Sequence, residues 1–355
     1  MDDGAAIAAG SSGPPLASRI GGVRRQLRPL ARQARFVRRF GPSYLREGAA
    51  SGRSLLARAR DVWAGFHPNE ADWYRQIRGH TRGVLTNRDR ETALHGLNGH
   101  YAYVLDNKAL FAELMRAREL ATPRVYAVST AGRWRFAPGG EAALAEALRR
   151  DGRIVVKPTL GSKGRSIRLC RSLDELDRFQ DEDAIATSFV VQAPYAHEIH
   201  AATLNTIRIL MMRDAAGRPV LAAAVHRFGT AGSGLVDNFS AGGLVAKVDV
   251  ATGTLDRAVT IVECNAVRFL DAHPDTGAPI AGVVVPGWDR VHDLVGALGD
   301  AFPELVYVGW DVAMTEAGPT VIEGNAHPSL RFFQFYDTLL DDPRVGPLFR
   351  RIVAR

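Results

Sequence analysis

The sequence predicts an α+β protein in which a helical N-terminal region precedes two mixed lobes. The first hundred residues have helical spacing without strand signals, short strands and helices alternate over 101–194, and strands dominate 195–335. A chain of 355 residues with 46% hydrophobic content is long enough to build more than one core. Residues 336–355 are expected to form a C-terminal helix.

The N-terminal region divides into two parts. Residues 1–18 are rich in Ala, Gly, Ser and Pro and are predicted to be disordered. Residues 19–100 are predicted to be helical and basic, with the clearest helical spacing between Ile20 and Phe40. Through residue 69, twelve arginines face four acidic residues, a formal charge of +8, whereas the whole chain carries +7. The positive charge therefore belongs to this region, and nucleic-acid binding by the rest of the chain is not supported.

The arginine-rich helix between Ile20 and Phe40 has two open interpretations. Its cationic face suits an anionic membrane surface or a partner protein, whereas its apolar stripe suits packing on its own domain. The sequence has no run of about 20 apolar residues and does not open with a basic segment and an apolar core. We therefore expect a cytoplasmic protein. Cys170 and Cys264 lack metal-ligand spacing and are expected to be buried as small hydrophobic residues.

Short elements alternate along the first lobe. Asp106 and Asn107 are helix-capping residue types, so a helix is expected from Lys108 to Leu120. The elements expected beyond it are a strand at 124–128, a helix at 140–150, a strand ending at 157, a return strand, a helix from 172 and a strand at 186–192. This alternation is typical of an α+β lobe.

The strand that ends at Lys157 leads into a glycine-punctuated loop. Gly161 and Gly164 allow backbone N–H groups to turn toward an anion without a side chain in the way. Lysine is scarce in this chain, which has only four, at positions 108, 157, 163 and 247. A compact ammonium group in such a loop favours binding of nucleotide phosphates, although an ordinary solvated lysine is the alternative.

The second lobe is expected to be built mainly of hairpins. Strands are predicted at 206–212, 220–227, 244–250, 255–262, 306–314 and 320–323, with a helix at 292–302. Asp311 and Glu323 interrupt apolar runs on the last two strands, and Asn325 follows two positions later. An unpaired buried carboxylate is costly, and Mg²⁺ prefers oxygen ligands, so this trio predicts a metal site. The alternative is a surface hairpin with polar outward positions.

The order of these motifs resembles the ATP-grasp superfamily. The nearest resemblance is to its sugar-transfer-associated, glutamate-ligase-related branch, and it extends from about Gly65 to about Gln334. The segments that carry it are Gly65-Phe66-His67-Pro68, Asn107-Lys108, Asn205-Thr206-Ile207-Arg208, Val236-Asp237-Asn238-Phe239-Ser240 with Gly242-Gly243, and Gly309-Trp310-Asp311. The resemblance implies an ATP-grasp fold, with two α+β lobes that clasp ATP.

The resemblance also implies residue roles. ATP would lie between the lobes with Mg²⁺, or Mn²⁺ as an alternative ion, held by Asp311, Glu323 and Asn325. The implied nucleotide-binding residues are Lys108, Lys157, Gly161, Ser162, Lys163, Gly164, Ser166, Gln192, Ala193 and Asn238. The loop from Gly161 to Ser166 would close over the phosphates, and the backbone from Gln192 to Pro194 would meet adenine.

Two arginines are candidates for binding the charge that develops on a transferred phosphoryl group. Arg208 lies on the strand at 206–212 and Arg227 ends the strand at 220–227. Fixed cations in a dry cleft are suited to this task. An ion pair on a strand face is the alternative for both. His226 and His327 flank the expected cleft, and lone histidines are more often structural than catalytic.

The leading functional prediction is an ATP- and Mg²⁺-dependent carboxylate–amine ligase that works through an acyl phosphate. No protein nucleophile is required, in agreement with the absence of a Ser-His or Cys-His signature. The branch implies a role in polysaccharide or glycoconjugate biosynthesis. The expected partners are ATP, a small carboxylate and an amine or sugar-linked acceptor, with a peripheral membrane or glycosyltransferase contact through the arginine-rich N-terminal region. The alternatives are a kinase-like phosphotransferase and a non-catalytic nucleotide-binding scaffold.

Overall fold

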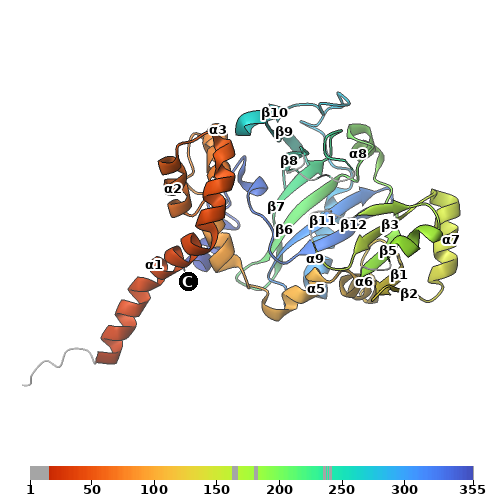
Figure 1. The fold of residues 1–355 in the computed structure, drawn as a ribbon, viewed down its shortest axis with the longest axis horizontal. Coiled ribbons are helices and arrows are strands. Elements are labelled where there is room, and N and C mark those ends of the chain that lie inside the picture. Colours follow the sequence, from red (N-terminus) through yellow and green to blue (C-terminus); the bar gives the residue numbers. More distant parts are fainter. Residues whose placement is uncertain are drawn as a thin grey trace, which may run out of the picture.

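The computed structural model describes residues 16–161, 167–179, 183–234, 237, 239 and 242–354. Two antiparallel sheets lie beside each other, and a group of helices from the N-terminal region covers one end of the molecule (Figure 1). The α+β fold class and the helical N-terminal extension are confirmed. The segment 1–18 that we predict to be disordered lies outside the described residues up to position 15, and its last three residues belong to the first helix.

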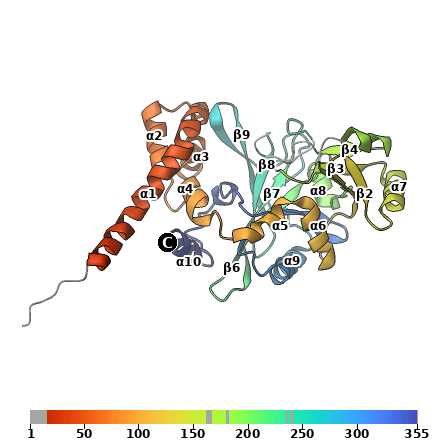
Figure 2. The ribbon, with the colours of Figure 1, turned by 60° about the horizontal axis from the view of Figure 1, so that its bottom comes forward.

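Three helices form most of the N-terminal region. They are α1 (Leu16–Glu47), α2 (Leu55–Ala64) and α3 (Pro68–Arg78). The Ser54 hydroxyl accepts a hydrogen bond from the Ala57 N–H at 3.3 Å and so fixes the start of α2. The beginning of α1 projects away from the rest of the protein in both ribbon views (Figures 1 and 2). No helix in the described part of the chain is long and apolar enough to cross a membrane.

A run of short helices connects this region to the first sheet. It consists of α4 (Asn87–Asp89), the π-helical turn η2 (Arg90–Leu94), η3 (Gly99–Tyr101), α5 (Ala102–Asp106) and α6 (Lys108–Ala117). The Asn107 side chain accepts hydrogen bonds from the N–H groups of Ala109 and Leu110, both at 3.1 Å. The predicted cap at the start of α6 is therefore confirmed.

The small sheet has five strands in the order β2-β1-β5-β3-β4. Its strands are β1 (Val125–Thr130), β2 (Arg133–Phe136), β3 (Ile154–Pro158), β4 (Arg168–Cys170) and β5 (Ala184–Ser188). Helix α7 (Gly140–Asp151) packs on β1 and β3 and buries Leu144. The sequence did not predict β2, and the strand expected at 186–192 ends at Ser188. The helix expected from Ser172 is a 3-10 segment, η4 (Asp174–Phe179).

The large sheet has seven strands in the order β10-β9-β8-β7-β6-β11-β12. Its strands are β6 (Thr206–Arg213), β7 (Pro219–Phe228), β8 (Leu244–Val248), β9 (Leu255–Val262), β10 (Ala266–Leu270), β11 (Tyr307–Thr315) and β12 (Gly318–Asn325). Three further helices accompany it: α8 (Pro194–Ile199), α9 (Trp288–Ala301), and α10 (Gly346–Val353). Strand β10 and helix α8 were not predicted from the sequence. The helix of the C-terminal segment 336–355 is confined to α10.

The two cysteines differ in their surroundings. Cys170 is buried in the core of the small sheet, as expected. Cys264 is exposed, so the prediction that it is buried was wrong. It lies in η6 (Glu263–Asn265), the short connection between β9 and β10, with φ of 57°. The polar residues Glu263 and Asn265 on either side of Cys264 mark this turn at the edge of the large sheet.

Candidate active site

Two acidic side chains face each other on adjacent strands of the large sheet. Asp311 on β11 pairs directly with Glu323 on β12 in the antiparallel register, and Asp311 is only 2% exposed. Residues directly opposite each other project to the same face of a sheet. Burial and the nearby Asp311 carboxylate raise the pKa of Glu323. The predicted convergence of these two side chains is therefore present in the fold.

Two arginines hold Asp311 in its ionised form. Arg208 lies opposite Asp311 on β6 and donates from Nη2 to Oδ2 at 2.7 Å, with a second contact from Nε to Oδ1. Arg227 Nη2 lies 3.0 Å from Asp311 Oδ2. Burial alone would raise the pKa of Asp311, but these two guanidinium groups lower it to about 2. The ion-pair interpretation of both arginines thus describes their contacts within the protein.

A second acidic residue completes this charge network. Asp237 Oδ1 lies 3.3 Å from Arg227 Nη2, and Asp237 Oδ2 accepts hydrogen bonds from the Thr206 N–H at 3.0 Å and its hydroxyl at 2.5 Å. Burial raises the pKa of Asp237, and Arg227 opposes that rise. From the sequence, Asp237 was named only within a segment that carries the family resemblance, and its role as a partner of Arg227 was missed.

The face of β12 that carries Glu323 opens into a cavity of about 540 Å³. We call it the carboxylate cavity, and its lining residues include Lys108, Gly161, Glu323, Asn325 and His327. Lys108 Nζ donates to the Gly161 carbonyl oxygen at 2.5 Å. The structure therefore brings together one predicted lysine, the first residue of the predicted lid and two of the three predicted metal ligands.

A second cavity of about 330 Å³ has mainly apolar walls. We call it the apolar cavity, and its lining includes Val155, Lys157, Leu169, Phe189, Val191, Gln192 and Ile322. Lys157 and Lys108 also share a narrow cleft between the two cavities. Burial lowers the pKa of Lys157, Glu323 opposes that shift, and Lys108 adds to it. The site is thus a mostly apolar chamber that ends at a half-buried lysine beside the carboxylates.

The residues expected to meet adenine make hydrogen bonds within the protein. Gln192 Nε2 donates to the carbonyl oxygens of His200 at 3.0 Å and Thr203 at 2.9 Å, and its Oε1 accepts from the Asn205 N–H at 2.9 Å. The Ala193 N–H donates to the Met314 carbonyl oxygen at 2.7 Å. Contact of these two residues with adenine stays a prediction, and Gln192 lines the apolar cavity.

Part of the predicted nucleotide set cannot be placed. Ser162, Lys163, Gly164, Ser166 and Asn238 lie outside the described residues. The described start of the lid loop, Gly161, has φ of 103°, a conformation in which glycine is strongly favoured.

The donor set of the carboxylates fits Mg²⁺. Asp311, Glu323 and Asn325 offer oxygen ligands only, as this ion prefers. The raised pKa of Glu323 is the supporting observation, because it reflects desolvation and repulsion from Asp311, which a divalent ion between the two carboxylates would relieve. The Asn325 amide nitrogen donates to the Gly309 carbonyl oxygen at 3.3 Å. This bond turns the amide nitrogen toward the sheet and leaves the amide oxygen as the atom offered to a metal ion.

Several wall residues were missed from the sequence. Ile322 lines the apolar cavity. It could have been predicted, because alternation along a strand directs it to the face opposite its neighbour Glu323. Phe189 and Val191 carried no distinguishing signal. Of the two histidines that were weighed, His226 is buried with its Nε2 2.9 Å from the Tyr195 hydroxyl, whereas His327 lines the carboxylate cavity.

The chain matches one protein family in sequence. Residues 175–342 match the family described as sugar-transfer associated ATP-grasp. No curated protein matches the chain.

Many solved structures have a similar chain path. The ATP-grasp ligase PsnB, in complex with a minimal precursor, Mg and ADP, is 15% identical, with 73% of this chain and 61% of that chain covered and a TM-score of 0.37. D-alanine–D-alanine ligase from Bacillus anthracis is 14% identical, with coverage of 70% and 69% and a TM-score of 0.39. Biotin carboxylase from Campylobacter jejuni is 10% identical, with coverage of 71% and 46% and a TM-score of 0.44. The chain spans less than two thirds of the PsnB structure.

Proposed function

We propose that this protein is an ATP- and Mg²⁺-dependent ligase that forms a carbon–nitrogen bond, since residues 175–342 match the sugar-transfer associated ATP-grasp family. One observation carries the proposal. Asp311 and Glu323 face each other beside a cavity that also holds Lys108, and this cavity lies next to an apolar chamber that ends at Lys157. Such a site has an apolar compartment for a base, cations for phosphates and oxygen ligands for a divalent ion.

The residues divide the work of binding ATP. The walls of the apolar cavity would take adenine, and Lys157 and Lys108 would bind phosphate oxygens. Mg²⁺ bound by Asp311, Glu323 and Asn325 would neutralise charge on the β- and γ-phosphates. Ser162, Lys163, Gly164, Ser166 and Asn238 remain proposed phosphate contacts of the two loops.

The arginines have a positioning role in this scheme. Arg208 binds Asp311 through Nε and Nη2, so its Nη1 is the atom we assign to an oxygen of the transferred phosphoryl group. Arg227 bridges Asp311 and Asp237 and keeps both carboxylates in place. Fixed charges in a water-poor cleft stabilise a transition state without reorganisation.

The proposed reaction has two steps. A carboxylate oxygen of the first substrate attacks the γ-phosphorus of ATP, the bond to the bridging oxygen breaks, and ADP leaves. The amine nitrogen of the second substrate then attacks the acyl carbon, inorganic phosphate leaves, and the amine loses a proton to solvent. The protein positions reactants in both steps and supplies no nucleophile.

The proposed setting is polysaccharide or glycoconjugate assembly in the cytoplasm, with an amine or sugar-linked acceptor. The words sugar-transfer associated in the family description support the link to sugar chemistry. The projecting, arginine-rich helix α1 would contact a membrane surface or a glycosyltransferase. Co-sedimentation of the full chain with anionic vesicles, and not with neutral ones, would support the membrane alternative.

An isotope experiment tests the reaction. Acids and amines are screened for ADP release, and the active acid is then prepared with ¹⁸O in its carboxylate. A ligase requires both substrates and transfers one ¹⁸O atom to the released phosphate. Glu323→Gln should lose this activity, and Lys247→Ala, which removes a distant lysine, should keep it. Phosphate retained on a hydroxyl acceptor would instead identify a kinase and contradict the proposal.

A further inference from the structure

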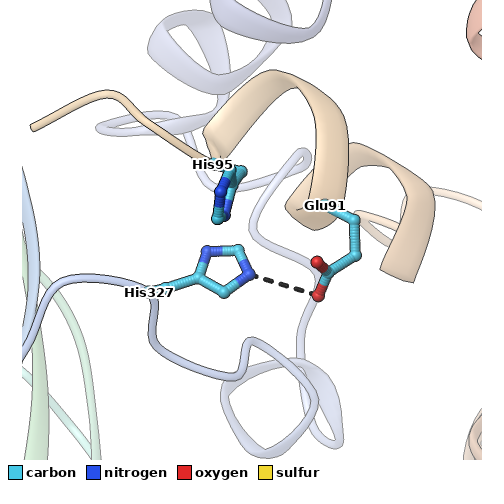
Figure 3. A group of neighbouring side chains, drawn as sticks. All are labelled: Glu91, His95 and His327. Atoms are coloured by element: carbon cyan, nitrogen blue, oxygen red, sulfur yellow. Dashed lines mark hydrogen bonds and ion pairs between the residues drawn. The ribbon is translucent and has the colours of Figure 1, made fainter. Parts of the chain in front are cut away.

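A second cluster of metal-binding residue types lies beside the carboxylate cavity. Glu91 belongs to η2, His95 follows η2 directly, and His327 belongs to the loop after β12, so segments far apart in the sequence meet here (Figure 3). One candidate ligand atom from each of the three residues lies within 4.8 Å of the others. His327 also lines the carboxylate cavity, so the cluster stands at its rim.

The three side chains have coordinating capacity to spare. Glu91 receives its hydrogen bonds at Oε1, from Arg90 and from His327 Nε2 at 3.2 Å, which leaves Oε2 for another partner. His327 Nδ1 is buried and has no hydrogen-bond partner among the described residues. His95 is exposed, and its ring meets the His327 ring edge-on with centroids 4.7 Å apart. Glu91 lies at Nε2 of His327 (Figure 3), so Nε2 is the ring nitrogen that could share an ion with this carboxylate, and the ion would replace the present hydrogen bond.

The backbone around the cluster is held in place. Arg90 donates from Nε to the Pro328 carbonyl oxygen at 2.9 Å and from Nη2 to the His327 carbonyl oxygen at 2.6 Å. These bonds fasten the loop of His327 to η2, the turn that carries Glu91. Leu94, at the end of η2, is fully buried and anchors the same turn. Single π-helical turns of this kind occur frequently at functional sites.

A second cluster shows why residue types alone are insufficient. His200, His273 and Asp275 also lie close together. However, His273 Nε2 is 2.8 Å from the Gly229 carbonyl oxygen, and its Nδ1 accepts from the Asp275 N–H at 3.3 Å. Both nitrogens of this ring are already used, so it has no lone pair for a metal ion. The cluster at η2 is free of this restriction.

We propose that Glu91, His95 and His327 bind a first-row divalent cation of the zinc type, at a site separate from the all-oxygen site of Asp311, Glu323 and Asn325. Two imidazoles and one carboxylate suit Zn²⁺, whereas Mg²⁺ prefers oxygen ligands alone. Tetrahedral coordination places ligand atoms about 3.3 Å apart, and the candidate atoms lie within 4.8 Å of one another, so a movement of the exposed His95 ring toward the other two would complete the geometry. The fourth position at the cavity rim would be taken by water or a substrate oxygen.

Zinc binding by the full chain tests this proposal without an assay of catalysis. Metal-free protein is dialysed against Zn²⁺ in the presence of excess Mg²⁺, which fills the oxygen site, and metal content is measured by mass spectrometry. We expect about one Zn²⁺ per chain, and an intense visible absorption band when Co²⁺ replaces it. His95→Ala should abolish the bound zinc, and Glu91→Gln should weaken its affinity by at least about tenfold.

Two variants serve as controls. His100→Ala removes another exposed histidine five positions from His95 and should keep the full zinc content. Glu323→Gln alters the proposed magnesium site and should also keep it. Absence of zinc from the wild-type protein, or equal zinc content in wild type and His95→Ala, would overturn the proposal. Because His95 is exposed, equal thermal midpoints of metal-free His95→Ala and metal-free wild type will show that any loss of zinc is local. The inference therefore stands or falls independently of the ligase activity.

Discussion

The two sheets contribute to the site in opposite ways. The large sheet supplies a charge network that is already balanced within the protein, since Asp311 is bound by both Arg208 and Arg227, and Arg227 also binds Asp237. The small sheet supplies Lys157, a half-buried cation whose pKa is lowered by desolvation and only partly restored by Glu323. The charges on the large-sheet side of the site are thus paired within the protein, whereas the charge of Lys157 on the small-sheet side is only partly compensated.

This difference predicts which property of the protein each sheet affects. The half-buried ammonium group of Lys157 gains an anionic partner when phosphate oxygens bind, so a substitution of Lys157 should change the affinity for nucleotide. The network around Asp311 stabilises the fold even without a ligand, because removal of one member leaves a buried charge without its partner. Substitutions in the two sheets should therefore separate protein stability from ATP affinity.

The largest effect is expected from Arg208→Ala in the large sheet. It removes the bidentate partner of buried Asp311, and breaking a buried pair in this way costs about 3–5 kcal/mol. Urea unfolding monitored by circular dichroism measures the loss. Arg218→Ala removes an exposed pair with Asp214 and should cost less than about 1 kcal/mol. Equal losses in the two variants would remove the basis for the comparison.

Lys157→Met in the small sheet should have the reverse pattern. The free energy of unfolding should stay the same or rise, because a desolvated ammonium is replaced by an apolar chain of similar length. ATP affinity should fall by roughly 10- to 100-fold, as expected for loss of a charged hydrogen bond of about 1.5–3 kcal/mol. Titration calorimetry measures the affinity, and Lys247→Met, which breaks an ion pair with Asp337, should leave it unchanged.

Acid should weaken the large sheet through His226. Burial lowers the pKa of this histidine from its ordinary 6.5 to about 3, so the folded protein holds it neutral between Tyr195 and the Arg227 carbonyl. The stability from this group is complete above about pH 6.5 and is lost as the pH falls toward 3. Between pH 7 and pH 5 the loss is about 2 kcal/mol. His226→Gln should flatten this part of the stability profile in urea titrations, and an unchanged slope would contradict the assignment.

The smallest effect concerns the two cysteines. In the native protein, one thiol should react rapidly with a colorimetric thiol reagent, because Cys264 is exposed and Cys170 is buried in the small sheet. The second thiol should react only when the protein unfolds. Cys264→Ser should remove the fast phase and change stability by less than about 0.5 kcal/mol. A fast phase that survives this substitution would contradict the burial of Cys170.

Local signals in the sequence predicted most of the fold. The Asn107 cap and the apolar runs of β6, β7 and β11 were recognisable because the hydrogen bonds and burial that define them lie within a few residues. Helix α9 begins at Trp288, four residues before its expected start at His292. Its N-cap is Gly287, whose φ is 69°, and this glycine was not recognised as a helix start from the sequence. Strand β10 follows the short turn Glu263–Asn265, in which Cys264 and Asn265 have positive φ, a conformation that the sequence did not reveal.

The site was predictable to a different degree at each residue. Asp311 and Glu323 stood out because carboxylates within apolar strands require partners, and the hairpin register placed them opposite each other. The contacts of Arg208 and Arg227 with Asp311 depend on the strand order β7-β6-β11, which is a long-range property of the sheet. For the same reason, no sequence signal connected Glu91 and His95 to His327, more than two hundred positions away.

Calorimetric titration of the full chain with ATP, with and without Mg²⁺, tests whether Lys157 of the small sheet binds the phosphates and Glu323 of the large sheet binds the metal ion. We predict that Lys157→Met weakens binding to a similar extent under both conditions. Glu323→Gln should bind ATP like wild type without Mg²⁺ and should lose the gain in affinity that Mg²⁺ gives the wild-type protein. A Mg²⁺-dependent gain that persists in Glu323→Gln, or unchanged ATP binding by Lys157→Met, would contradict the assignment of ATP and its metal ion to this site.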